Sequence, residues 1–430
     1  MKHCLIIGSG IAGLNAASLL ASKNISVTIL ESSPKLGGRT YSFLETQTNQ
    51  IVDNGQHLLM GCYKDSLAFI KLTGAEDNFS YQKNLNVKFI NRDRKIYSLN
   101  ASSFPYPFNL LNAVLNYDVL NFSSKIKFIR FLVSFRFISE SALSNLTVSD
   151  WLEKENQNDT QLKNLWEILC VGTLNTSISK ASALVFYRIL KLMFLKGNYA
   201  ATLILPKYGL SESIVNPASE YIKKHGGKIF TSEPVKKIEI SNNKIETVTS
   251  DKKVYKDFDF VISAVPHYAL EKIIDVEILD IDVEFEYSTI LNIHIWIDDL
   301  ILDEMFYGLL NSPLHWIFNK GDHINVVISD ADYLAEKSKD EILNLIIDEL
   351  SIYTSIKKEN ITNYKIIKEK RATFVPDKNS LSKRPQPTTK IKNLILAGDW
   401  IDTGLPSTIE SAAKSGRLAA DIVLSEINKL

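Results

Sequence analysis

Gly8-Ser9-Gly10-Ile11-Ala12-Gly13 is a GxGxxG turn, and the segments on either side of it decide the fold around it. Residues 5–7 are apolar and predict a short strand, whereas residues 14–23 place Ala and Leu at helical spacing. Residues 27–30 then predict a second strand. A strand, a glycine turn, a helix and a second strand, in this order, are what a dinucleotide-binding Rossmann unit requires.

The three glycines of this turn have separate physical tasks. The first permits a tight turn, the second lets the backbone approach a pyrophosphate, and the third lets the helix pack closely on the strand. The start of the helix adds free N–H groups and a partial positive charge that attract phosphate. Glu31 follows the second strand, where its carboxylate can accept hydrogen bonds from ribose hydroxyls and would repel the 2′-phosphate of NADP. The residues expected to bind the dinucleotide here are Gly8, Gly10, Ile11, Ala12, Gly13 and Glu31.

The next stretch, Pro34-Lys35-Leu36-Gly37-Gly38-Arg39-Thr40, favours FAD over NAD. Gly37 and Gly38 let the backbone pass close beside a cofactor, and Arg39 carries a fork of donors suited to phosphate or to the edge of a flavin. A glycine-rich loop with a solvated arginine is the alternative interpretation. The position of the stretch directly after Glu31 favours the cofactor.

Later segments complete the same unit. Residues 210–224 have helical periodicity, residues 228–240 alternate like paired strands, and residues 258–263 predict a buried strand. Residues 394–397 predict another short strand, and residues 408–427 predict a helix rich in Ala, Ser and Ile. The cofactor domain is therefore expected to be discontinuous in sequence.

The length of 430 residues, of which 45% are hydrophobic, suffices for two domains. We expect an α/β fold whose Rossmann-type FAD-binding domain comprises residues 1–80, 207–266 and 390–430. Residues 81–206, mostly helical in pattern, and residues 267–389, which mix strand and helix patterns, would form a second, α+β substrate-binding domain.

Composition excludes several classes of protein. Lys plus Arg and Asp plus Glu both total 49, so no overall field attracts nucleic acid. Cys4, Cys62 and Cys170 are far apart and lack CxxC spacing, which argues against a disulfide framework and against a metal site. A strand is expected directly after the first three residues and no apolar run has transmembrane length, so we expect a cytoplasmic protein.

Two long strings carry a family resemblance. Together with the residues named above, the chain resembles the amine oxidase and phytoene desaturase superfamily of flavoproteins. Two strings are similar to the signatures of the squalene-associated FAD-dependent desaturases in this superfamily. The first is Asp53-Asn54-Gly55-Gln56-His57-Leu58-Leu59-Met60-Gly61-Cys62-Tyr63, and the second is Gly398-Asp399-Trp400-Ile401-Asp402-Thr403-Gly404-Leu405-Pro406-Ser407-Thr408-Ile409-Glu410-Ser411-Ala412. Pro206, Gly209-Leu210-Ser211 and Ser263-Ala264-Val265-Pro266 follow the order of that family. The resemblance spans the cofactor domain and is thin through the substrate domain, and it implies an amine-oxidase-like arrangement of the two.

The resemblance also implies which residues hold FAD. Gly398 and Asp399 would bind its pyrophosphate and ribityl region, and Thr408 and Ile409 would present backbone N–H groups to the pyrimidine end of the flavin. A helix that begins near residue 408 agrees with this, because its positive dipole end would face the negative charge of a reduced flavin. The string that passes the flavin ring contributes Gly55, Gln56 and His57. Val235 would contact the adenine end through its backbone, although an ordinary strand valine explains this position nearly as well.

Asp53 and His57 are the first candidates for acid–base catalysis, because their string passes the flavin ring in the resembled family. His57 has the alternative of a hydrogen bond to the backbone or to the flavin, and buried polar residues usually have such structural roles. Asp402 is a weaker candidate, since an aspartate two residues before Gly404 typically caps a turn.

The implied activity is the reductive removal of the hydroxyl group of hydroxysqualene, in which a proton is donated to the oxygen, water leaves and reduced flavin delivers hydride. The alternatives are a carotenoid-type desaturase that transfers hydride to the flavin, a flavin amine oxidase, and a non-catalytic carrier of an isoprenoid. Residues 405–407 stand where amine oxidases tend to place aromatic residues, which counts against that alternative. We find no second dinucleotide motif, so a reductase or free reduced flavin would be the electron donor.

Residues 104–138 are dense in large apolar side chains and contain four cations with no acidic residue after Asp118: Lys125, Lys127, Arg130 and Arg136. An apolar face rimmed by cations could lie against an anionic bilayer, from which an isoprenoid must come. Residues 184–195 have the same character. Core helices whose basic side chains reach outward are the alternative. The family resemblance favours peripheral membrane contact.

Overall fold

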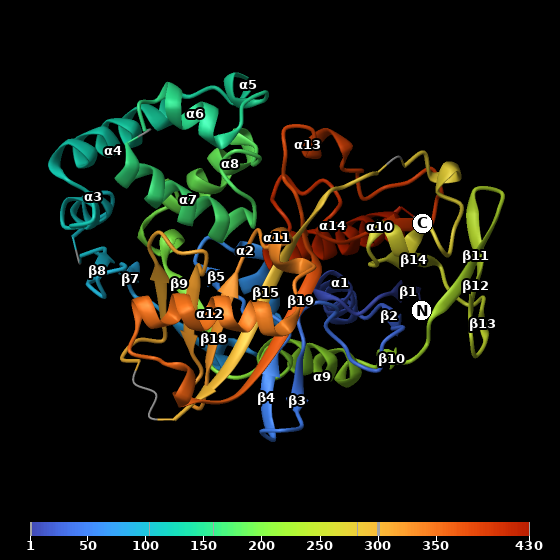
Figure 1. Cartoon of the computed structure of the whole chain (residues 1–430). Coiled ribbons are helices and arrows are strands. Elements are labelled where there is room, and N and C mark those ends of the chain that lie inside the picture. Colours follow the sequence, from blue (N-terminus) through green and yellow to red (C-terminus); the bar gives the residue numbers. More distant parts are fainter. Residues whose placement is uncertain (1, 103, 158, 282, 299–301, 430) are drawn as a thin grey trace.

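The computed structural model describes residues 2–102, 104–157, 159–281, 283–298 and 302–429. A five-stranded parallel sheet carries the glycine turn, in the order β10–β2–β1–β14–β20 (right-hand side of Figure 1). Its strands are β1 (His3–Ile7), β2 (Ser26–Leu30), β10 (Lys228–Phe230), β14 (Phe260–Ser263) and β20 (Leu394–Leu396). Strands β14 and β20 are wholly buried, as expected for a parallel sheet that is covered on both faces. The Rossmann-type α/β unit predicted from three separate parts of the sequence is therefore confirmed.

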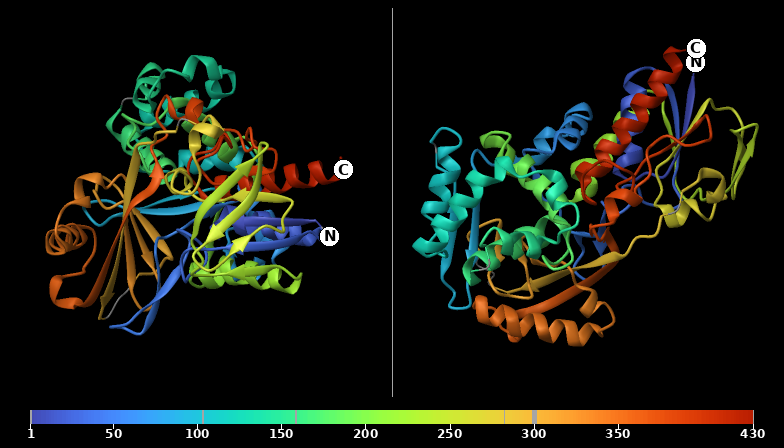
Figure 2. Two further views of the ribbon diagram at one scale, coloured as in Figure 1. Left: turned by 90° about the vertical axis from the view of Figure 1, so that its right-hand side faces the viewer. Right: turned by 90° about the horizontal axis from the view of Figure 1, so that it is seen from above.

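Two long helices pack against each other beside this sheet, α1 (Ile11–Ser22) and α14 (Ile409–Asn428). A Cβ atom at Gly416 would lie 2.3 Å from the carbonyl oxygen of Ala12, so only glycine permits this close helix contact. Asn15 donates a hydrogen bond of 2.7 Å from its side chain to the carbonyl of Ala413. The first and last helices of the chain are thus fixed to each other, and Figure 2 shows both chain ends near this pair.

Smaller elements complete this side of the molecule. Helix α9 (Asn216–Lys224) follows a π-helical turn, η4 (Ser211–Val215), where one continuous helix was expected. Helix α2 (Lys64–Leu72) packs on α14. The remaining strands here are β3 (Ser42–Glu45), β4 (Gln50–Asp53), β5 (Leu59–Met60), β6 (Phe79–Tyr81), β9 (Leu203–Pro206), β11 (Val235–Ser241), β12 (Lys244–Ser250) and β13 (Val254–Tyr255).

A seven-stranded sheet forms the second part of the molecule, in the order β19–β15–β18–β17–β16–β7–β8. Its strands are β7 (Asn86–Ile90), β8 (Ile96–Asn100), β15 (Tyr287–Ile297), β16 (Phe306–Leu309), β17 (Trp316–Asn319), β18 (Ile324–Ile328) and β19 (Ile361–Phe374). One face packs on α12 (Lys339–Tyr353) through Leu291, Ile293 and Ile295. Because side chains alternate along a strand, Ile290 and Asn292 point to the opposite face.

A layer of helices covers that opposite face (upper left in Figure 1). It consists of α3 (Phe108–Leu115), α4 (Phe122–Ser134), α5 (Glu140–Leu143), α6 (Val148–Lys154), α7 (Thr160–Leu174) and α8 (Ala183–Phe194). Phe131 packs on Trp151 and Trp166 at the centre of the layer. Side-chain caps start α4, α6 and α8, at Asn121, Thr147 and Ser182 respectively.

Short helical segments connect the larger elements: η1 (Glu76–Asn78), η2 (Phe135–Phe137), η3 (Asn198–Ala201), α10 (His267–Leu270), η5 (Val276–Leu279), α11 (Asp332–Ala335), η6 (Lys358–Asn360) and α13 (Ser380–Lys383). Among the helices in the described part of the chain, none is both long enough and apolar enough to cross a membrane.

Candidate active site

A cavity of about 1310 Å³ extends from the glycine turn to the helical layer. It exceeds the roughly 300–1,000 Å³ of ordinary small-molecule sites, so it has room for two ligands. We call its two parts the dinucleotide arm, lined by the glycine turn, Glu31, residues 37–39, Val235 and the C-terminal motif, and the apolar arm, lined by residues of β7, β8, β17, α3, α4 and α7. Of the residues predicted to contact the cofactor, all line the cavity except Gly13, and their contact with it stays a prediction.

The glycine turn leaves a space that a pyrophosphate fits. Gly8 has φ +101°, and Gly13 lies so close to the turn that an added Cβ atom would stand 2.1 Å from the carbonyl oxygen of Gly8. A Cβ atom at Gly10, by contrast, would meet no described protein atom within 4 Å. Gly10 begins α1 as its N-cap residue and has no side chain to satisfy the first N–H groups of the helix. Open space and free donors together suit a phosphate ligand.

Glu31 is held in place by the turn that it faces. One carboxylate oxygen of Glu31 accepts two hydrogen bonds from Ser9, one from its backbone N–H (2.8 Å) and one from its side-chain hydroxyl (2.6 Å). The other accepts from the N–H of Ser33 at 2.8 Å. The side chain is nearly buried yet lines the cavity. A carboxylate fixed in this way keeps acceptor capacity for ribose hydroxyls.

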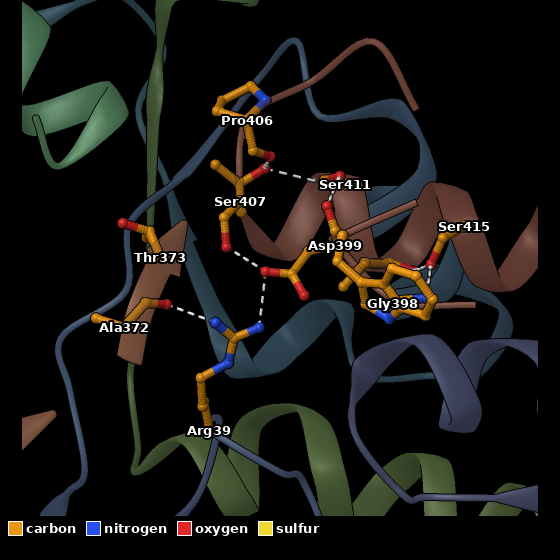
Figure 3. Close-up of polar contacts among 12 residues, drawn as sticks. Arg39, Ala372, Thr373, Gly398, Asp399, Pro406, Ser407, Ser411 and Ser415 are labelled. Carbon is orange, nitrogen blue, oxygen red and sulfur yellow. Dashed lines mark hydrogen bonds and ion pairs between the residues drawn. The ribbon is translucent and has the colours of Figure 1, made fainter. Parts of the chain in front are cut away.

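Three distant segments meet at Arg39 (Figure 3). Its guanidinium donates to Asp399 at 2.7 Å and to the carbonyl of Ala372 on β19 at 2.5 Å, and the hydroxyl of Ser407 also donates to Asp399. Burial opposes the charged forms of both partners, but the ion pair outweighs it: the pKa of Asp399 is lowered and the pKa of Arg39 is raised. The pair is charged at neutral pH and joins the second loop of the Rossmann unit to the C-terminal motif.

The N-terminus of α14 faces the cavity. Thr408 is the N-cap residue, and its hydroxyl accepts from the N–H of Ser411 at 3.1 Å, while Ile409 lines the cavity. Glu410 points away and accepts from the N–H groups of Asp65 and Ser66 at the start of α2. The helix therefore presents its positive dipole end to the cavity, as the sequence predicts, with the ion-paired carboxylate of Asp399 beside Ser407.

Arg384, which the sequence analysis did not single out, fixes the loop before α14. Its guanidinium donates to the carbonyls of Leu405 and Asp399 and to the hydroxyl of Thr403, over 2.5 to 2.9 Å. Burial lowers its pKa to about 10. A single arginine before a proline-rich loop gives no signal in the sequence. Asp402 accepts from the N–H of Gly404 at 3.1 Å, which confirms it as a turn cap.

The structure separates the two candidate acid–base residues. Asp53 is only 2% exposed and does not line the cavity. Its carboxylate accepts from the hydroxyl of Ser42 (2.7 Å) and the N–H of Leu210 (2.8 Å), and pairs with Lys320 at 3.3 Å. This arrangement favours a role for Asp53 in positioning the turn that follows it.

His57 does line the cavity, next to Gly55 and Gln56. Burial lowers its pKa to about 4, and the attraction of Asp53 offsets this only in part. The imidazole is therefore neutral at pH 7, and it can donate or accept a single hydrogen bond at each ring nitrogen. It is a partner for a hydroxyl group rather than a source of positive charge.

Polar side chains on the floor of the cavity were missed from the sequence. The floor is the face of the seven-stranded sheet opposite α12, and its end at β19 and β15 carries Glu369, Arg371 and Asn292. Asn292 accepts from the N–H of Gln56 at 3.1 Å, and Asn54 donates to Glu369 at 3.4 Å. We call this the polar end of the floor. The alternation of side chains along residues 361–374 predicts a strand with two faces, but it does not indicate which of the two faces borders a cavity.

Away from β15, the floor is mostly apolar. Val327 on β18, Trp316 and Phe318 on β17, and Val87 and Phe89 on β7 follow one another across the sheet away from β15. The polar end therefore lies between the dinucleotide arm and a chamber whose floor is hydrocarbon.

Exposed apolar side chains gather where the cavity meets α3 and α4. Phe108, Val133 and Phe137 line the cavity and yet are 63%, 64% and 84% exposed. Arg136 lines it beside them. Large apolar side chains that face both a cavity and the solvent indicate an opening that another apolar surface covers.

Comparison with known proteins identifies relatives over the whole chain. The model of the family described as flavin containing amine oxidoreductase matches residues 11–424. A hydroxysqualene dehydroxylase of Zymomonas mobilis is 29% identical over 98% of both chains. A 15-cis-phytoene desaturase of an Oncidium hybrid is 22% identical over 99% of this chain and 78% of its own. An oxidoreductase of Methanosarcina mazei has a similar structure, with a TM-score of 0.76 and 17% identity over 98% of this chain and 100% of its own.

Proposed function

The chain belongs to the family of flavin-containing amine oxidoreductases and is an FAD-dependent oxidoreductase, and we propose that it removes the hydroxyl group of hydroxysqualene to give squalene. One observation carries this proposal beyond the likeness to hydroxysqualene dehydroxylases: a small polar area separates the dinucleotide arm from a long apolar arm. A ligand with one hydroxyl group on a long hydrocarbon chain matches that distribution of polarity. The domain division expected from the sequence stays part of the proposal.

We place FAD in the dinucleotide arm. The open space at Gly10 would receive the pyrophosphate, Glu31 would bind the adenosine ribose, and Val235 would lie at the adenine end. Asp399 and Gly398 would hold the ribityl region, and the N-terminus of α14 would face the pyrimidine edge. When bound and reduced, FAD supplies the hydride for the reaction.

The polar end of the floor would hold the reacting hydroxyl. We propose that the carboxyl group of Glu369 donates a proton to the hydroxyl oxygen. The C–O bond then breaks, water departs, and an allylic cation remains. Addition of a hydride to that carbon completes squalene, and Glu369 is protonated again from solvent. Neutral His57 would hydrogen-bond the hydroxyl group and orient it. Asp53 would hold the turn on which His57 is carried.

The test uses FAD-loaded protein, reduced beforehand and kept anaerobic, with hydroxysqualene in detergent. Squalene that forms in step with flavin reoxidation supports the proposal. Flavin that is not reoxidised, together with reduction of oxidised flavin by phytoene or squalene, would assign the chain to the desaturases instead. Reduced free flavin, compared with a reductase, identifies the electron donor in the same assay.

We also propose that the opening at Phe108, Val133 and Phe137 rests on the cytoplasmic face of an anionic membrane. The exposed apolar rim can enter the interface between lipid headgroups and chains, and Arg130 and Arg136 add attraction for anionic lipid. A long isoprenoid would then enter the cavity without crossing water. Flotation with liposomes tests this, and protein that stays entirely in the lipid-free fraction would contradict it.

A further inference from the structure

Trp316 connects the floor of the cavity to the helices above it. It begins β17 and pairs in register with Gly308 on the neighbouring strand β16. A Cβ atom at Gly308 would lie 2.5 Å from the ring of Phe89 and 3.1 Å from Cζ3 of Trp316, and a Cβ atom at Gly172 on α7 would lie 3.3 Å from Cζ2 of the same indole. At 3.1 and 3.3 Å, a methyl group at either glycine would require the indole to shift by a few tenths of an ångström. Gly172 on the helical side thus makes room for the indole, and Gly308 on the sheet makes room for both Phe89 and the indole.

The indole stands between the polar end and the far strands. The sheet order places β17 two strands beyond β15, and the ring leans over β16 toward Phe89 on β7, with ring centres 6.2 Å apart. At about 4.8 Å per strand, β16 lies roughly 14 Å from β15. A hydrocarbon arm that extends from the polar end along the floor therefore meets the indole partway along its length.

The cavity continues beyond this point. On the far side of the indole the cavity is lined by Leu85, just before β7, by Leu99 on β8 and by Phe128 on α4. Space therefore exists beyond the ring. α7 follows the same direction overhead, because Asn175 at its end donates to Thr373 on β19 while Leu165 lines the chamber further along. The indole therefore narrows a passage that is otherwise continuous.

We propose that Trp316 is a specificity-determining residue that selects the length of the isoprenoid chain. Packed between Gly172 and Gly308, its indole limits the length and the width of a linear chain that extends from the polar end. The cavity therefore favours thirty-carbon over forty-carbon isoprenoids. This inference rests on the proposed function for its ligand class. It does not depend on the direction of hydride transfer.

Measurement of hydrocarbon binding tests the role of Trp316 in chain-length selection without requiring turnover. Squalene and phytoene are titrated in detergent into the oxidised, FAD-loaded protein, and dissociation constants are read from the shift of the flavin absorbance bands. Trp316→Ala should shift the ratio of the two constants at least tenfold toward phytoene, and Trp316→Phe should shift it less. Gly172→Ala should act in the opposite direction, because its new methyl group pushes the indole into the passage.

Phe318→Leu is the matched control. Phe318 lines the cavity on the same strand but is not enclosed by the two glycines, so its replacement should weaken both ligands without changing their ratio. An unchanged ratio in Trp316→Phe that retains FAD would overturn the inference and leave the proposed function intact. Failure of the unaltered protein to bind either hydrocarbon would overturn both.

Discussion

In the dinucleotide arm, glycines, helix N–H groups and a few charged side chains face the cavity, whereas in the apolar arm hydrocarbon side chains from many elements do. The first arm is built from short, contiguous strings, since residues 8–12, 37–39, 398–400 and 407–409 supply most of it. The second draws single residues from strands and helices that lie far apart in the chain. Phosphates and riboses need donors at fixed positions, but a hydrocarbon chain needs only volume and shape.

The junction between the two arms is where this difference matters for chemistry. Glu369 and Asn292 come from the sheet of the apolar arm, and His57 from the turn beside the dinucleotide arm. With FAD bound as proposed, the flavin on one side and the apolar chamber on the other would exclude water from the reacting carbon. A side chain at this junction therefore has more effect on the rate than one within either arm.

The largest expected effect tests the junction. Glu369→Gln should lower kcat by about 100-fold, the usual scale for loss of a general acid, while FAD affinity and KM change little. Glutamine keeps an oxygen for the hydrogen bond from Asn54. Glu336→Gln, at an exposed glutamate that pairs with Lys370, is the control and should be neutral. An unaltered kcat in Glu369→Gln would show that Glu369 is not the proton donor.

A second prediction compares two glycines of the dinucleotide arm. In Gly10→Ala the new methyl group meets no described protein atom, so the melting temperature of the cofactor-free protein should not change. FAD affinity should fall by about 100-fold, because the methyl group occupies the space for the pyrophosphate. Gly13→Ala should instead lower the melting temperature itself, since its methyl group collides with Gly8. FAD titration and thermal unfolding distinguish the two, and equal FAD affinity in Gly10→Ala would remove the pyrophosphate from this turn.

His315 directly precedes β17 and does not line the cavity, but the sheet that carries it and the dinucleotide arm should respond differently to acid. Burial holds His315 neutral with a pKa of about 4, so between pH 6.5 and 4 the unfolded chain binds a proton that the folded chain does not. Stability is therefore lost as the pH falls through this window, by about 2 kcal/mol at pH 5 for this histidine. The lowered pKa of Asp399 instead contributes stability that is lost only below its ordinary value of 3.8.

His315→Gln isolates this difference. Denaturant unfolding of the cofactor-free protein at pH 7 and pH 5 should give a smaller loss of stability in the variant than in the unaltered protein. His225→Gln, at an exposed histidine on the surface, should leave the loss unchanged. Equal losses in all three proteins would show that His315 is protonated in the folded state.

The smallest expected effect concerns the opening of the apolar arm. Phe137→Ser removes an apolar side chain that is 84% exposed. Because burial of this side chain in the membrane would contribute about 1 kcal/mol or more, the variant should lower the fraction bound to anionic liposomes by several-fold. Tyr333→Ser, at an exposed aromatic residue on α11, is the control. Equal flotation of both variants would assign membrane contact to another surface.

The sequence alone predicted much of the dinucleotide arm. The GxGxxG turn, Glu31, Gly37-Gly38-Arg39 and the start of the last helix are local patterns, and each stands where expected around one cavity. The ion pair between Arg39 and Asp399 was not predicted, because 360 positions separate its partners. Asp53 and His57, only four residues apart, could not be told apart by motif, yet one is bonded behind the turn and the other faces the cavity.

What the sequence by itself determined is the Rossmann unit and the class of cofactor, since the conformation of a phosphate-binding turn depends on neighbouring residues and on glycines that no other residue replaces. The tertiary structure decided the rest: the apolar chamber, the polar end with Glu369 and Asn292, and Trp316 between Gly172 and Gly308. These groups come together only when two faces of packed elements enclose a space. Alternation in a strand gives two faces but does not say which of them will border that space.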